Sequence, residues 1–528
     1  MRWDFPFPSQ RMPVLADNVV ATSQPLAAQA GLSVLSRGGN AVDAAIAAAA
    51  ALTVVEPTSN GLGGDLFALV WRSGVLHGIN ASGRAPALLD GDVVRRAGAM
   101  PKVGWWPVTT PGAVSGWVAL SERFGTQPLS TVLAPAIRYA REGFLVSPQT
   151  ASAWARAADR FAGFAAFREV FLPRMRAPRA GERFSAPSHG ATLEAIAETR
   201  GAAFYTGTIA AAMDAAARAE GGFLRAADLA AHRPSWVTPL SVPYRRRWRL
   251  HELPPNGQGI AALIALGILD RLPTGGHAPG SGPWVHLQIE SMKLGFADAH
   301  RYVSDPDFAD IDVRTLLTPA YLDGRAALVD PGRAQDFSHG APRPGGTVLV
   351  TAADAAGTMV TLIQSNYMGF GAGVVVRGTG VALQNRGCGF SLDAGHPNAV
   401  SGGKRPYHTI IPGFLTCEGA PVAALGVMGG PMQPQGHLQV VSHLVDQGLN
   451  PQAALDAPRW RLESGRAVSL EDGWPPAVID WLRGAGHDLR EGQPRTVHFG
   501  GGQVVWRLED GGYVAGSDLR RDGQAVGW

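Results

Sequence analysis

A glycine–threonine pair in the last third of the chain offers residue types that can do chemistry. Residues 330–346, DPGRAQDFSHGAPRPGG, cannot form a regular element and indicate an exposed linker, which runs directly into the strand pattern TVLVTAAD at 347–354. Threonine is a weak nucleophile unless a base takes its proton, and the α-amine of an N-terminal threonine can be that base. Gly346 leaves the carbonyl before Thr347 sterically open, so this bond suits a cut that makes Thr347 N-terminal. A Gly-Thr pair at a strand start is also common without catalysis, so the spacing alone leaves a structural role open.

The helices and strands around the Gly346–Thr347 bond, called the junction below, must position it. Residues 347–354 and 358–366, joined by a turn at 355–357, predict a β-hairpin. Near the start of the chain, 23–37 predicts a helix that Ser23 can cap, and Asn40 can cap a second helix so rich in alanine that it indicates tight burial between layers. Three further helices are predicted at 129–142, 259–270 and 285–302.

Composition limits the class of protein. The 528 residues are 46% hydrophobic and 17% charged, which is typical of a soluble globular protein and excludes disordered and fibrous classes. The net charge of +3 comes with no basic run, so nucleic acid is not an expected partner. No apolar run is long enough for a membrane helix or a leader peptide, and the two cysteines, Cys388 and Cys417, suit free thiols in a reducing compartment. We therefore expect a cytoplasmic protein that does not contact membranes.

Six blocks spread along nearly the whole chain bear on the Gly346–Thr347 bond. They are 38–65, 107–117, 292–306, 345–385, 402–412 and 426–437. In this order they resemble the blocks of the γ-glutamyltranspeptidase family, whose members are N-terminal nucleophile hydrolases. This resemblance implies an α+β fold, a four-layer αββα sandwich in which two stacked antiparallel sheets are flanked by helices. The chain resembles the branch of glutathione hydrolase-like proteins, oxamate amidohydrolase and some cephalosporin acylases.

The resemblance assigns the catalytic residues. Thr347 becomes the new N-terminus and the nucleophile after a cut between Gly346 and Thr347. Ser365 stands where the family has a second hydroxyl that hydrogen-bonds the nucleophile's amine. Gly429 and Gly430 match the pair whose backbone N–H groups face the developing oxyanion. Without the family, Ser365 would be an ordinary polar face residue and the glycines a tight turn.

The same resemblance implies a set of substrate-binding positions. His408 and Thr409 fall where the family places two serines beside the substrate carboxylate, although without the family His408 would more often be a satisfied core histidine. Tyr367 replaces an asparagine that contacts the donor, and Asn385 ends the fourth block.

The residues that would bind a glutamyl donor differ from the family pattern. Gly389 takes the place of the aspartate that holds the α-ammonium, and Ser82 takes the place of the arginine for the α-carboxylate, with Arg84 two residues later. The stretch 389–406 is too short for the full lid loop. Arg84 is the first candidate to bind the donor carboxylate. Other side chains could supply the missing charges: Arg386, Lys404 and Arg405 as cations, and Asp393 as an acid.

The resemblance implies an enzyme made as a precursor. Segment 1–346 would be the large subunit and 347–528 the small one, forming one intertwined core and a self-derived heterodimer, with further dimerisation left open. The first hypothesis is hydrolysis of γ-glutamyl amides, as in glutathione, with weak transpeptidation. The alternative is an amidohydrolase or acylase acting on short carboxylate amides such as oxamate or glutaryl amides. No metal or organic cofactor is implied, and a catalytically dead binding module is disfavoured by the retained catalytic set.

Overall fold

The computed structural model describes residues 11–309, 311–337 and 346–528, and for residues 346 and 347 it describes the backbone. Two seven-stranded sheets form its centre, and every pairing within them is antiparallel. The first sheet has the strand order β1 (Val14–Ala16), β20 (Tyr513–Ser517), β19 (Gly501–Arg507), β15 (Ala420–Met428), β14 (Gly413–Cys417), β9 (Trp248–Glu252) and β8 (Leu240–Tyr244). The second has the order β21 (Gln524–Gly527), β2 (Val19–Thr22), β10 (Gly346–Ala353), β11 (Met359–Tyr367), β3 (Asp65–Arg72), β4 (Val75–Ala81) and β7 (Ser235–Val237).

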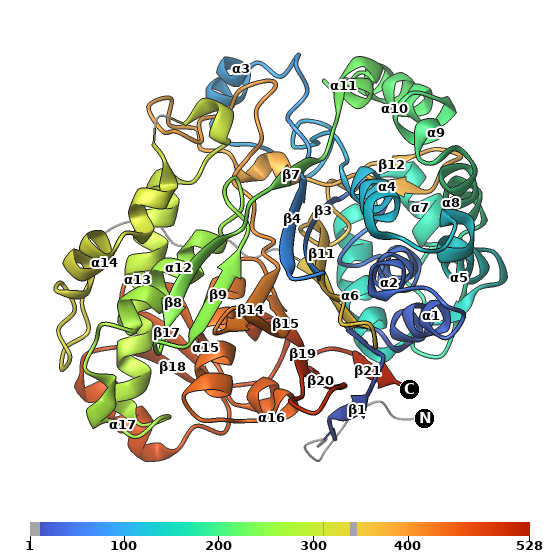
Figure 1. Ribbon diagram of the computed structural model, residues 1–528. Helices are drawn as coiled ribbons and strands as arrows, with labels where there is room; N and C mark the ends of the chain where they lie inside the picture. The colour runs from blue at the N-terminus through green and yellow to red at the C-terminus, as the bar shows by residue number, and fades with distance from the viewer. Residues whose placement is uncertain (1–10, 310, 338–345) are drawn as a thin grey trace.

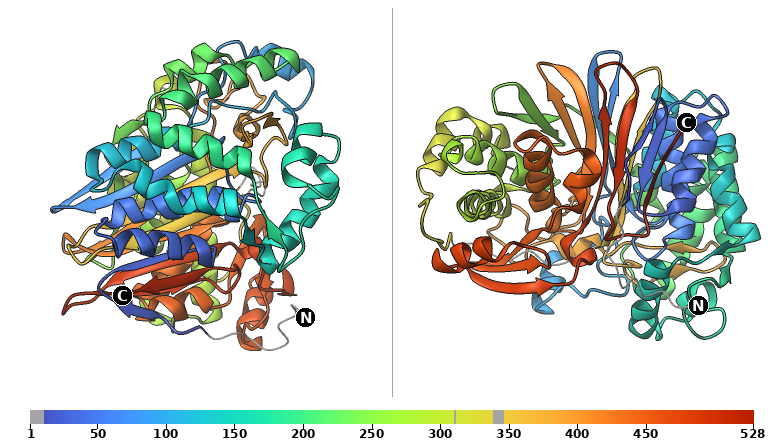
Figure 2. Two further views of the ribbon diagram at one scale, coloured as in Figure 1. Left: turned by 90° about the vertical axis from the view of Figure 1, so that its right-hand side faces the viewer. Right: turned by 90° about the horizontal axis from the view of Figure 1, so that it is seen from below.

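Helices cover the outer face of each sheet, which gives the four-layer αββα sandwich that the sequence predicts (Figures 1 and 2). α2 (Ala41–Val55) packs on β10 and β11 from one side, α1 (Pro25–Leu35) packs beside it on β2 and β21, and α5 (Leu129–Glu142) packs against α2. On the other side, α12 (Gly259–Leu269) and α15 (Met432–Val445) pack on the first sheet, with α13 (Gly282–Tyr302) behind them. Within the described ranges, no helix is both long and apolar enough to span a bilayer.

The remaining helices and strands extend these layers. The helices are α3 (Gly91–Arg96), α4 (Ala113–Phe124), α6 (Pro148–Phe161), α7 (Ala165–Phe171), α8 (Pro187–Thr199), α9 (Ala202–Tyr205), α10 (Thr208–Ala219), α11 (Ala226–Ala231), α14 (Pro319–Ala326), α16 (Pro451–Asp456) and α17 (Pro476–Gly484). The smaller sheets are β5 (Phe144–Leu145) with β6 (Arg183–Phe184), β12 (Val375–Val376) with β13 (Val381–Ala382), and β16 (Trp460–Ser464) with β17 (Ala467–Glu471) and β18 (Asp488–Gln493).

The central strand β10 separates two hydrophobic cores. Val348 and Val350 pack with the helix layer that contains α2, whereas Leu349 packs between the two sheets against residues such as Phe414 and Met428. This alternation is the period of two that a strand requires when both of its faces are buried. Packing therefore fixes both faces of β10 from Val348 to Ala353.

Local predictions hold with small shifts. The predicted hairpin is β10 and β11, paired antiparallel with Thr351 opposite Thr361. Asn40 caps α2 in a capping box with Asp43. One cap was predicted wrongly: α1 begins at Pro25 and is capped by Gln24, whose Oε1 accepts the Leu26 N–H at 2.6 Å. Ser23 instead donates its hydroxyl to the Glu56 carboxylate at 2.5 Å.

Candidate active site

Thr347 lies at an irregularity near the start of β10. The Cα of Gly346 pairs with that of Tyr367, and the next pair along the ladder is Val348 with Gln364. One residue of β10 therefore lies opposite two residues of β11, Ser365 and Asn366, which is the geometry of a β-bulge. The structure thus brings the backbone of the predicted nucleophile opposite its predicted supporting serine.

Ser365 organises the end of β11. It is fully buried, and its Oγ accepts the backbone N–H of Tyr367 at 2.7 Å. Tyr367 has φ +77°, a left-handed conformation that is costly for a bulky residue and persists only when the surroundings enforce it. The Ser365 hydroxyl is one of the groups that enforces it, so this side chain shapes the backbone directly beside the junction.

The glycine pair lies where β15 gives way to α15. Gly429 has φ +126° and Gly430 has φ +62°, and α15 begins at Met432. A Cβ on Gly429 would lie 3.0 Å from the Cα of Gly500, so both the conformation and the space require glycine there. The first N–H groups of a helix lack intrahelical partners and carry the positive end of its dipole, which favours nearby negative charge. The location therefore suits stabilisation of an oxyanion.

Gln258, at the N-cap of α12, holds this turn in place. Its Nε2 donates to the carbonyl of Gly430 at 2.9 Å and to that of Thr409 at 2.7 Å, and its Oε1 accepts the Tyr407 hydroxyl at 3.0 Å. Sequence reasoning did not identify Gln258. The only signal for it is its position in the proline- and glycine-rich break at 253–259 that precedes a helix.

A buried polar network lies beneath the site. The Asp65 carboxylate accepts the His408 Nε2–H at 3.1 Å, and it accepts the Gly83 backbone N–H at 3.0 Å and the Gln384 amide at 2.9 Å. Because the Ile410 N–H donates to Nδ1 of His408 at 3.3 Å, the ring carries its proton on Nε2. Burial raises the pKa of Asp65 to about 7, against the opposing charge of Arg386, and burial lowers the pKa of His408 well below its usual value. His408 is thus a neutral ring whose one N–H is committed to Asp65.

Arg386 is a buried cation beside this network. Its Nη1 donates to the Thr409 hydroxyl at 2.9 Å, and its Cζ lies 4.2 Å from the centre of the Tyr367 ring. Burial lowers the pKa of Arg386 to about 10, which still leaves the guanidinium charged at neutral pH.

A cavity of about 410 Å³ opens next to these residues. Its walls include Tyr367 and Thr409, Gln258 and Pro431 beside the glycine pair, and Gly389. Among the described residues that line it, none is an aspartate or a glutamate. A ligand here meets hydroxyl, amide and imidazole groups and the exposed Lys102, but no carboxylate.

Comparison with known proteins gives this geometry a context. The sequence model of a family described as Gamma-glutamyltranspeptidase matches residues 27–528. The chain belongs to that family. It is accordingly an enzyme of the hydrolase type, with the fold of the N-terminal nucleophile hydrolases.

Two relatives and one solved structure are similar to this chain along nearly its whole length. A glutathione hydrolase-like YwrD proenzyme of Bacillus subtilis is 34% identical over 96% of this chain and 98% of its own length. An oxamate amidohydrolase proenzyme of Klebsiella pneumoniae is 35% identical over 95% and 97%. A solved structure, the cephalosporin acylase from Bacillus halodurans, is 47% identical with a TM-score of 0.96 and covers 100% of this chain and 99% of its own.

Some of the residues that were predicted to bind substrate do not line the cavity. Arg84 forms ion pairs with Asp305, at 2.6 Å, and with Asp307, and it donates to the Gly403 carbonyl. Asn385 accepts the Met368 N–H and donates to the Lys102 carbonyl, so it holds backbone in place.

The other candidate charges also lie outside the cavity lining. Arg405 donates to the Ser82 carbonyl at 3.1 Å and Lys404 to the Pro397 carbonyl. Asp393 accepts the Gly395 N–H. For all of these side chains, a contact with substrate stays a prediction.

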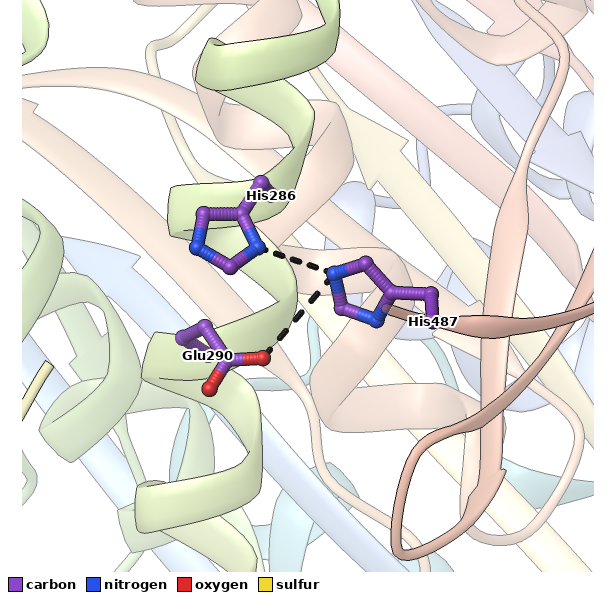
Figure 3. Close-up of side chains that lie close together, drawn as sticks. All are labelled: His286, Glu290 and His487. Atoms are coloured by element: carbon purple, nitrogen blue, oxygen red, sulfur yellow. Dashed lines mark hydrogen bonds and ion pairs between the residues drawn. The ribbon is translucent and has the colours of Figure 1, made fainter. Parts of the chain in front are cut away.

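A second cluster of titratable side chains lies away from this site. His286 and Glu290 of α13 lie near His487, which follows α17, and all three are buried (Figure 3). The His286 Nδ1 lies 2.8 Å from the His487 Nε2, and the His286 Nε2 donates to the Asp330 carbonyl at 2.9 Å.

The carboxylate of this cluster already has its partners. One oxygen of Glu290 accepts from the Lys293 ammonium at 2.7 Å, and the other accepts the Gln335 N–H at 3.2 Å. Because an ammonium already compensates the carboxylate, the arrangement is that of a closed ion-pair network rather than an open ligand set. The network ties 330–335, just before the junction, to α13 and to the C-terminal half of the chain.

Proposed function

We propose that this γ-glutamyltranspeptidase-family enzyme processes itself at the Gly346–Thr347 bond and then hydrolyses amides through an acyl-Thr347 intermediate. The observation that carries the proposal is the bulge that places the backbone of Thr347 opposite Ser365, next to a cavity bordered by the turn after β15. The description of two similar relatives as proenzymes supports it.

The chemistry of maturation uses one hydroxyl and one water. The Thr347 hydroxyl attacks the Gly346 carbonyl carbon, the C–N bond breaks and the freed amine takes a proton, which leaves an ester. Water then hydrolyses the ester, so segment 1–346 ends in a carboxylate and segment 347–528 begins with the Thr347 α-amine. That amine is the base that the hydroxyl needs in later turnovers.

Turnover repeats the same steps on a substrate amide. The hydroxyl attacks the substrate carbonyl, and the N–H groups at Gly429 and Gly430 stabilise the oxyanion that develops. The amine product leaves with a proton, and water hydrolyses the acyl ester.

We propose that the acyl group is a short one that carries a second carboxylate, with no requirement for an α-ammonium. Gly389 borders the cavity, and no described lining residue offers a carboxylate to hold an ammonium there. A buried ammonium without a partner is costly. This supports the oxamyl or glutaryl type of donor over the γ-glutamyl type, although the similarity to a glutathione hydrolase-like protein keeps γ-glutamyl amides as the second candidate.

Two experiments test the proposal. Purified wild-type protein should split without added protease into chains of 346 and 182 residues (528 − 346 = 182), whereas Thr347→Ala should stay one inactive chain of 55.4 kDa. Thr347→Ser should still split, because only the hydroxyl is required. Processed enzyme should then be given oxamyl, glutaryl and γ-glutamyl amides in parallel. Cleavage of the Thr347→Ala chain at this bond, or turnover of none of the three amides, would contradict the proposal.

A further inference from the structure

The Arg386 guanidinium has one edge without a partner. Its side chain is fully buried, and among the described residues neither Nε nor Nη2 has a hydrogen-bond partner. These two N–H groups share one edge of the planar guanidinium, the fork that a carboxylate accepts with two parallel hydrogen bonds. The Nη1 on the opposite edge is already held by the Thr409 hydroxyl, which fixes the orientation of the fork.

No nearby carboxylate of the described chain fills this fork. Asp65 is the close acid, and both of its oxygens are occupied, one by His408 and the other by Gly83 and Gln384. A buried charged donor that lacks its hydrogen bonds loses more free energy than a neutral one. Retaining such a group in the core is therefore a cost that a bound anion would remove.

The Arg386 guanidinium lies directly behind two residues of the cavity wall. Tyr367 and Thr409 both contact the guanidinium and both line the cavity. Tyr367 is also the Cα partner of Gly346, so Arg386 lies one side chain away from the junction. Both fork nitrogens are shielded from solvent, so side chains around the guanidinium must move for an anion to reach them, and the Tyr367 ring is one of its neighbours.

We infer that Arg386 is the residue that binds the distal carboxylate of the acyl donor, and that Arg386, rather than Arg84, selects amides of short dicarboxylic acids. This inference rests on the proposed function, since it assigns the specificity of the same site. Arg84 already has two carboxylate partners and lies outside the cavity lining, whereas Arg386 has an unused bidentate edge behind it.

The test compares two p-nitroanilides of the same shape. One carries a glutaryl group, and in the other an amide replaces the distal carboxylate. Arg386→Gln should lower kcat/KM for the glutaryl donor by about 10²-fold, because a lost bidentate charge pair costs on the order of two decades in affinity. The neutral donor should change far less, so the ratio of the two kcat/KM values should fall towards one.

Two other arginines give matched comparisons. Arg461→Gln removes a buried arginine whose Nε also has no hydrogen-bond partner but forms an ion pair with Glu463, and it should keep the wild-type ratio. Arg84→Gln tests the rival directly. If Arg84→Gln lowers the ratio and Arg386→Gln does not, the inference is wrong.

A measurement on wild-type enzyme guards against variants that fail to fold. Glutarate should raise the melting temperature of the processed enzyme and glutaramide should not, and Arg386→Lys should weaken this response because an ammonium has no fork. Equal shifts with both compounds would overturn the inference even if neither variant folds. If wild-type enzyme neither splits nor hydrolyses amides but still distinguishes glutarate from glutaramide, the proposed function fails and the anion site stands.

Discussion

Replacing Gln258 with methionine tests whether its hydrogen bonds support catalysis in addition to the stability of the fold. Gln258 is fully buried and makes three hydrogen bonds, to the carbonyls of Gly430 and Thr409 and from the Tyr407 hydroxyl. At about 1 kcal/mol net for each hydrogen bond, Gln258→Met should lower the free energy of unfolding by about 3 kcal/mol. Because the turn that orients the Gly429 and Gly430 N–H groups loses its anchor at the Gly430 carbonyl, kcat should also fall by about 10²- to 10³-fold.

Gln439 on α15 provides the matched control. It is also buried, and it too donates to two backbone carbonyls, of Gln435 and Trp460, and accepts one N–H. Gln439→Met should therefore lower the melting temperature about as much as Gln258→Met while leaving kcat within a few-fold of wild type. The assay is initial-rate hydrolysis of the preferred amide together with thermal unfolding of each processed variant. Equal kcat values in the two variants would refute a role for Gln258 in holding the oxyanion turn.

Three further predictions follow from the same geometry. Ser365→Ala should lower kcat much more than it raises KM, because it frees the Tyr367 backbone and misplaces the Thr347 amine; steady-state kinetics showing only a raised KM would contradict this. Gly429→Ala should lower kcat on the order of 10²-fold. Gly357 also has a positive φ, +88°, but has open space around an added Cβ, so Gly357→Ala should change the melting temperature alone. Equal losses of kcat in the two variants would argue against the glycine turn as the oxyanion site. Burial lowers the pKa of His189 to about 4, so the unfolded chain takes up that proton first as the pH falls; the stabilisation is complete above pH 6.5 and is lost between about 6.5 and 4. Denaturant unfolding of the Thr347→Ala chain at pH 7 and pH 4.5 should therefore show a smaller loss with His189→Gln, by about 2 kcal/mol, and an unchanged loss would exclude this histidine as a cause.

The sequence predicts those features that depend on neighbouring residues. The β10–β11 hairpin and the capping box at Asn40 each lie within a short stretch whose pattern specifies them, and both are found within about a residue of their expected positions. The cap of α1 was misassigned because Ser23 finds a partner in Glu56, thirty-three residues away, and only the folded chain brings the two together.

The substrate-binding set depends even more on distant contacts. Arg84 is two residues from the family position, but its ion pairs involve Asp305 and Asp307, more than two hundred residues later. No residue near Arg84 in the sequence indicates that these two aspartates are its partners. The roles of Gln258 and of the open edge of Arg386 likewise depend on loops that are far apart in the sequence and meet only in the folded chain.

The order of strands in the two sheets bears on how such an enzyme can be made. In the second sheet, β10 and β11 from after the junction lie between β2 and β3 from before it, and in the first sheet β20 lies between β1 and β19. Neither half of the chain, produced alone, would contain a complete sheet, and each would expose strand edges that invite aggregation. Under the proposed cut, the intact chain would therefore act as its own assembly template, whereas two halves encoded as separate genes would have to fold around each other from the start.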